Sequence, residues 1–343
     1  MLYHIGGICM SNWEIEFAKF RAQFRGLANK YVNCEENLTV YHYTNIQGFK
    51  GIIESGNIYF SSMNALNDET ETYYIWKLIN KNKEILFENE NKEYRIFINK
   101  FFQYIEIEKI LTENVLPNYD LEVYSASFSF SKDSLPNWRG YTDGARLGCC
   151  IEFQYKNVVE NFLDLLRGNS GVEILDDKYR LALFSAGKII YDKNAQLKEI
   201  RSTLKKIYRL YTDENNCKEF LLLKNHNEFL KDKDFEHFVF DEMYKSMRIL
   251  NIFFKDNCFS TEDEYRIIFP TSKYIESPFK IEYRTTENYL IPYIEVKYPK
   301  DSIREVMLAP INKNPNSRLS IENFLKDNGI NAKVTYSKLP LRF

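Results

Sequence analysis

One stretch of the chain gathers side chains that could bind a small polar ligand. Residues 41–71 run YHYTNIQGFKGIIESGNIYFSSMNALNDETE. His42 offers a directional hydrogen bond, as donor or acceptor according to its tautomer, and Tyr59 offers an aromatic face for stacking. A purely structural role is the alternative for both, because His42 shares a strand face with Leu38 and Val40 and Tyr59 fits a strand core.

A second group of charged residues alternates along one predicted strand. Glu262, Glu264 and Arg266 are spaced two apart, so they project from one strand face. A nearby cation lowers the pKa of a carboxyl group, so Arg266 could hold Glu264 ionised in a cleft. The apolar Ile268 continues this face and indicates partial cover. An exposed charge ladder on an edge strand is the alternative.

Aromatic and turn residues supply further candidates. Trp138 and Tyr141, three residues apart, could form a wall for a base, although core packing is the common outcome for such a pair. Asn67 and Asp68 form a turn pair that could cap a helix or belong to a loop that closes over a nucleotide. Thr44 has capping-box spacing with the glutamine three residues later, so it is predicted to cap a helix.

Alternating and helical patterns give the elements that must position these residues. The apolar positions repeat at three- and four-residue steps in helices and at every second residue in strands. Helices are predicted over 11–32, 46–55, 69–114, 155–167, 194–250 and 318–327. Strands are predicted over 38–43, 57–62, 122–130, 147–153, 181–192, 264–270, 279–283, 288–297, 303–308 and 332–336.

These elements predict an α+β fold. An N-terminal helical extension covers residues 1–36, and a single α+β domain covers 37–343. Two helical insertions interrupt that domain, near 69–114 and 194–250. Strand order cannot be derived from these patterns.

Composition excludes several classes of protein. The 343 residues are 44% apolar and 16% aromatic, enough to build a folded core. A net charge of −2 gives no basic field that would attract nucleic acid or a membrane surface. The six cysteines lack C-x-x-C spacing and the four histidines lack H-E-x-x-H spacing, so no metal is expected. With no apolar run near 20 residues, a cytoplasmic protein with reduced thiols is expected.

Three motif blocks resemble a bacterial family known as domain of unknown function 2971. The blocks are YHYTN…IIESGNIYFSS…LNDETE, FSFSKD…NWRGYTDGARLGCCIEF and FSTEDEYRIIF. Their order over residues 40–310 carries the resemblance. The chain departs from the family pattern at Glu69, where proline is usual, and at Tyr265, where tryptophan is usual.

The first block is also similar to ADP-ribosyltransferases, including poly(ADP-ribose) polymerases and DNA-modifying DarT toxins. This resemblance implies a split antiparallel or mixed sheet, NAD as a substrate and a His–Tyr–Glu set at His42, Tyr59 and Glu264. Cleavage of the nicotinamide–ribose bond builds positive charge on the ribose, as in glycoside hydrolysis, and a carboxylate stabilises that charge. The implied nucleotide contacts also include Tyr43, Thr44, Ser61, Ser62, Asn67, Asp68, Trp138, Tyr141 and Arg266.

The resulting expectation is an ADP-ribosyltransferase-like enzyme or NAD glycohydrolase. By analogy it would be a toxin or anti-phage defence effector that modifies a protein or nucleic acid, with a partner protein in the defence system. An inactive module that senses a nucleotide or a partner protein is one alternative. A metal-dependent enzyme that processes nucleic acid is another, and its acidic set would be Asp68, Glu71, Glu262 and Glu264.

Overall fold

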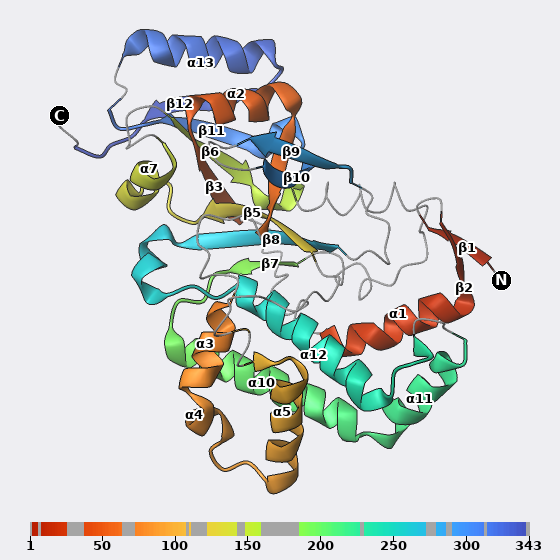
Figure 1. Cartoon of the computed structure of the whole chain (residues 1–343). Coiled ribbons are helices and arrows are strands. Elements are labelled where there is room, and N and C mark those ends of the chain that lie inside the picture. Colours follow the sequence, from red (N-terminus) through yellow and green to blue (C-terminus); the bar gives the residue numbers. More distant parts are fainter. Residues whose placement is uncertain are drawn as a thin grey trace.

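A ten-stranded sheet lies between two groups of helices in the computed structural model (Figure 1). Helices α2 (Ile46–Ser55) and α13 (Pro315–Asp327) cover one face, and the larger helical group lies beyond the other. The α+β class predicted from the sequence is confirmed. The structure describes residues 2–5, 8–25, 38–63, 73–107, 110, 122–142, 148–158, 185–226, 230–271, 279–285, 290–311 and 314–340.

The sheet is antiparallel except for one parallel pair, β11 with β12. Its order is β12-β11-β6-β3-β5-β4-β10-β9, while β8 pairs with β5 and β7 pairs with β8. The strands are β3 (Thr39–Thr44), β4 (Asn57–Ser62), β5 (Glu122–Ser129), β6 (Cys149–Gln154), β7 (Ser185–Lys188), β8 (Glu264–Thr271), β9 (Ile281–Thr285), β10 (Leu290–Lys297), β11 (Ile303–Leu308) and β12 (Lys333–Tyr336).

Strand β5 is the point where the sheet divides. One of its edges pairs with β8 along its whole length. The other edge is shared, because β3 pairs at Ser129 through Tyr41 whereas β4 pairs at Ser125 through Ser61. Between these positions, residues 126–128 have no register partner on β3 or β4. The two strands therefore diverge from β5 and leave a fork between them.

Helix α2 connects the two arms of the fork. Its buried residues Phe49 and Ile53 pack on the apolar sheet face. It ends at Gly56, whose φ of 68° is the left-handed conformation that glycine adopts readily. The predicted cap at Thr44 is wrong. Thr44 ends β3, and the cap is Asn45, whose Oδ1 accepts a hydrogen bond of 2.8 Å from the Gly48 amide.

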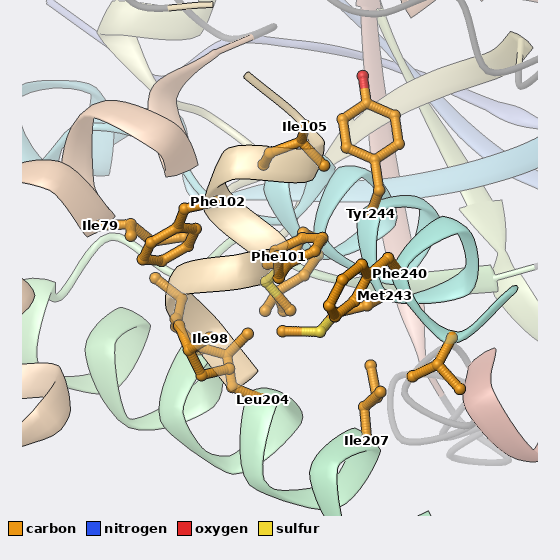
Figure 2. Packing of buried hydrophobic residues seen from close by; sticks show 14 of the residues in the cluster. Ile79, Ile98, Phe101, Phe102, Ile105, Leu204, Ile207, Phe240, Met243 and Tyr244 are labelled. Carbon is orange, nitrogen blue, oxygen red and sulfur yellow. The ribbon is translucent and has the colours of Figure 1, made fainter. Parts of the chain in front are cut away.

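The helices beyond the other face share an aromatic-rich core (Figure 2). Phe101 and Phe240 pack there with Met243, Leu204 and Ile98. The helices lie where the sequence predicts insertions, and α12 reaches the sheet through Ile249 and Ile252. They are α3 (Tyr74–Lys81), α4 (Lys83–Phe87), α5 (Lys92–Tyr104), α10 (Lys193–Thr212), α11 (Glu214–Lys224) and α12 (Phe235–Ile252).

Several element boundaries differ from those expected. The first helix, α1, covers Asn12–Arg25, and the hairpin of β1 (Leu2–Ile5) and β2 (Ile8–Ser11) before it was not predicted. Strand β8 continues to Thr271. Most of the helix predicted over 155–167 lies outside the described residues. Within the described part of the chain, no helix has the length and apolarity needed to cross a bilayer.

Candidate functional site

A cavity of about 450 Å³ opens at the fork between β3 and β4. This volume is within the range of about 300–1,000 Å³ usual for ligand pockets. The floor comes from β5, and the walls come from β3, α2, β4, β8, β9, the helix α7 (Leu135–Tyr141) and the 3₁₀ helix η5 (Asn257–Glu262). His42, Tyr59 and Glu264 all line it. Three distant chain segments therefore meet at one opening.

His42 has a defined tautomer. Its Nδ1 lies 3.0 Å from the carbonyl oxygen of Ser127, in the part of β5 that has no register partner on β3 or β4. A carbonyl can only accept, so Nδ1 carries the hydrogen. Burial lowers the pKa of the imidazole, and the bond to Ser127 opposes that shift only in part. The ring is therefore neutral at pH 7, and its Nε2 is a hydrogen-bond acceptor.

Glu264 is a buried carboxylate that is held ionised. Its side chain receives two bonds from Arg266, Nε to Oε1 at 2.6 Å and Nη2 to Oε2 at 3.0 Å. Lys255 Nζ lies 3.4 Å from Oε2. Burial raises the pKa of the Glu264 carboxyl, but the charges of Arg266 and Lys255 outweigh it, so the pKa lies below its usual range. The residue is suited to stabilise positive charge and not to donate a proton.

The lowered pKa predicts how Glu264 contributes to stability at different pH values. The unfolded carboxyl titrates near about 4.3, so the stabilisation is complete above that pH and is lost as the pH falls through the lower folded value. The free energy of unfolding should therefore decrease between about pH 5 and pH 3, and should decrease less in Glu264→Gln. Urea unfolding across that range measures both slopes. If the free energy of unfolding falls equally steeply as the pH is lowered in wild type and in Glu264→Gln, the pKa of Glu264 is not lowered in the folded protein.

A second carboxylate and a lysine complete the charged wall. Lys255 Nζ lies 2.7 Å from Oε2 of Glu262, which lines the cavity. The ammonium group thus bridges Glu262 and Glu264. Tyr141 lies in the same wall with its side chain 46% exposed, and desolvation of its hydroxyl together with these two negative charges raises its pKa to about 12. Its hydroxyl keeps its proton at neutral pH. Lys255 follows α12 in no recognisable motif, so no sequence pattern points to it.

The opposite wall carries an aromatic face and a cation. Tyr59 is 39% exposed, and its ring stacks on Tyr293 with the ring centroids 4.3 Å apart. Ser61 accepts a hydrogen bond of 3.1 Å from Nη2 of Arg284. Tyr59, Ser61 and Arg284 line the cavity. Sequence reasoning missed Tyr293 and Arg284, because only the pairing of β4, β10 and β9 brings them beside Tyr59.

Tyr43 and Thr44 line the cavity but already have local roles. The Tyr43 hydroxyl donates to the Ser131 carbonyl at 2.6 Å and accepts from the Ser134 amide at 3.0 Å. Thr44 lies close to the first turn of α2, where a Cβ added to Gly48 would stand 2.2 Å from its Oγ1. Both residues therefore shape the wall of the cavity.

Other predicted residues lie away from the cavity. Trp138 is fully buried and donates from Nε1 to Asp133 at 2.8 Å, so it does not form a wall with Tyr141. Ser62 and Arg266 are also buried and are not among the lining residues. Three predicted residues lie outside the described part of the chain: Asn67, Asp68 and Glu71. Among the residues that the structure describes, no cluster of His, Cys, Asp and Glu could hold a metal ion.

Comparison with known families agrees with the second and third motif blocks, most of which the match covers. A family described as Protein of unknown function (DUF2971) matches residues 137–267, which confirms the resemblance over this segment. The match includes the cavity residues Tyr141, Glu262 and Glu264, whereas His42 and Tyr59 precede it. No curated protein and no solved structure matches the chain.

Proposed function

We propose that this chain is an ADP-ribosyltransferase-like enzyme that uses NAD as its substrate. One observation carries the proposal: a cavity at the fork of the sheet has a neutral imidazole, an exposed phenol ring and an ionised buried carboxylate in its walls. These are His42, Tyr59 and Glu264, the set that the resemblance to ADP-ribosyltransferases implies. The divided sheet is also consistent with the fold type of those enzymes.

Each group has a chemical part in breaking the nicotinamide–ribose bond. The leaving ring nitrogen takes the bonding electron pair, so nicotinamide departs neutral and the ribose becomes an oxocarbenium ion. Glu264 stabilises that cation electrostatically, and the ring of Tyr59 stacks on nicotinamide. Nε2 of His42 accepts a hydrogen bond from a ribose hydroxyl. Arg284 supplies positive charge for the pyrophosphate from the wall of the cavity.

The acceptor of the ribosyl group is water, a protein or a nucleic acid. The proposal of a toxin or anti-phage effector, with a partner protein in a defence system, rests on the resemblance and not on the geometry. Release of nicotinamide from NAD by the purified chain, with and without cell extract as a source of acceptor, tests the central reaction.

Two substitutions of His42 separate its ring nitrogens. The amide nitrogen of His42→Asn can take the place of Nδ1 and donate to the Ser127 carbonyl, but nothing replaces Nε2. The longer His42→Gln places an amide near Nε2 and leaves the carbonyl without its donor. We expect His42→Asn to lower kcat/KM for NAD about tenfold or more with little change in thermal stability. His42→Gln should lose stability but retain more activity.

Full activity in His42→Asn together with lost activity in His42→Gln would contradict a ligand contact through Nε2 of His42. If His42→Asn keeps full activity, the imidazole is structural and its bond to Ser127 is its whole contribution. Thermal unfolding of both variants distinguishes loss of folded protein from loss of ligand contact.

A sensor without catalytic activity is the second candidate. It is favoured by the engagement of both Glu264 oxygens by Arg266 and Lys255, which restricts access of a ribose hydroxyl to the carboxylate. Binding of NAD without release of nicotinamide would support this candidate.

Activity on nucleic acid that requires magnesium but not NAD would instead support a metal-dependent enzyme. Against that alternative, Lys255 already bridges the acidic pair Glu262 and Glu264.

A further inference from the structure

Asn137 has an incomplete set of hydrogen bonds in the cavity wall. It lies in α7, is 1% exposed and lines the cavity. Its Nδ2 donates to Ser129 Oγ at 2.9 Å and to the Glu262 carbonyl at 3.3 Å. Its Oδ1 is buried and accepts no hydrogen bond from the described residues.

The neighbouring bonds fix the orientation of this amide. Ser129 Oγ donates its only hydrogen to the Glu262 carbonyl at 2.7 Å. It therefore receives, and cannot supply, hydrogens in its contacts with the Ser131 amide and Asn137. A rotated amide would place Oδ1 against the Glu262 carbonyl, two acceptors facing each other. Oδ1 is thus held as an acceptor that needs a donor.

A ligand in the cavity that Asn137 lines can supply that donor, provided that the wall shifts enough to expose Oδ1, which is otherwise buried. Buried acceptors without a partner are uncommon because they have lost water without gaining a bond. Asn137 lies beside the reacting end of the proposed site, since its partner Ser129 is the register partner of Glu264. At that end of NAD, the group with N–H donors is the carboxamide of nicotinamide.

We propose that Asn137 Oδ1 accepts a hydrogen bond from the carboxamide NH₂ of NAD and makes the site selective for a primary amide. This inference rests on the proposed function. It predicts discrimination against 3-acetylpyridine adenine dinucleotide, in which a methyl ketone keeps the carbonyl but removes the N–H donors. A site built to bond an N–H group rejects an analogue that lacks it, because the protein acceptor is then left unpaired.

The test compares dissociation constants for the two dinucleotides by calorimetry, together with nicotinamide release. Wild type should bind NAD about tenfold more tightly than the analogue. Asn137→Ala should lose this preference by weakening NAD alone. Asn137→Asp keeps an acceptor oxygen but sets its second oxygen against Ser129 Oγ and the Glu262 carbonyl. It should therefore bind both dinucleotides more weakly than wild type while retaining the preference for NAD.

Ser129→Ala is the matched control for the structural role of Asn137. It removes one of the two partners of Nδ2 but leaves Oδ1 in place, so it should weaken both dinucleotides by the same factor. If Asn137→Ala weakens the binding of both dinucleotides equally, the inference is wrong. Asn137 then has only a structural role, through its hydrogen bonds to Ser129 and Glu262. If Asn137→Ala does not fold, Asn137→Asp provides the test instead. Loss of the preference for NAD in that variant would also overturn the inference. Wild type that binds neither dinucleotide would overturn the proposed function itself.

Discussion

Replacement of Glu264 by glutamine is expected to lower the rate of nicotinamide release from NAD by about 10²–10³-fold, with a change in NAD affinity below about tenfold. The magnitude is that of removing one preorganised electrostatic group from a site where charge develops in the transition state. Glutamine has nearly the same shape and keeps one oxygen acceptor for Arg266. The substitution therefore keeps the shape of the side chain but removes its charge and one of the two acceptor oxygens that Arg266 and Lys255 engage.

The reason for this large effect is the environment of the carboxylate. Glu264 is buried, and its pKa is held low by Arg266 and Lys255. A charge that is already ionised and fixed in position needs no reorganisation when the ribosyl cation forms. Ground-state NAD has less positive charge at that carbon, so the rate should fall much more than the affinity. Single-turnover rates and dissociation constants measure the two effects separately.

Loss of stability is the main competing explanation and requires a matched control. Removing one partner of a buried ion pair costs about 3–5 kcal/mol, although Glu262 still pairs with Lys255 in this variant. Ile268→Ala on the same strand face should cost about 2–5 kcal/mol, and Ile268 does not line the cavity. The folded Ile268→Ala protein should turn over NAD normally. Equal loss in both variants would contradict an electrostatic role for Glu264.

Local sequence patterns predicted most elements of the fold but not their pairing. Strand periodicity placed β4 at residues 57–62, and alternation correctly separated His42 from Tyr41 on opposite faces. The fork depends on where Tyr41 and Ser61 meet β5. These are contacts between segments far apart in the chain, and a single sequence has no local signal for such a register.

The site shows the same division between local and long-range information. Residue type and resemblance point to His42, Tyr59 and Glu264, and the structure brings all three to one cavity. Local sequence patterns do not identify Lys255 and Arg284, because their roles depend on the residues that the fold places beside them. The capping error has a local cause, since adjacent threonine and asparagine residues both suit a cap and helix limits are uncertain by one or two residues.

Substitution of Gly51 by phenylalanine is expected to abolish NAD binding, with a dissociation constant raised more than about 100-fold, while the protein stays folded. Gly48 and Gly51 lie three residues apart on α2, so they share a helix face, and both line the cavity. The two glycines differ in surroundings. A Cβ at Gly48 would meet Thr44 Oγ1, whereas a Cβ at Gly51 would meet nothing within 4 Å. A side chain at position 51 therefore starts in open space, and we expect a phenylalanine ring there to occupy ligand space.

Stability separates this blocked cavity from a damaged fold. Glycine inside a helix is less favourable than alanine by about 0.5–1 kcal/mol, so Gly51→Ala should raise the unfolding temperature and keep NAD affinity within a few-fold of wild type. Gly48→Ala should lower the unfolding temperature, because its Cβ collides with Thr44. If Gly51→Phe is stable and still binds NAD as wild type does, the ligand lies elsewhere. His42, Tyr59 and Glu264 would then share an opening without sharing a substrate.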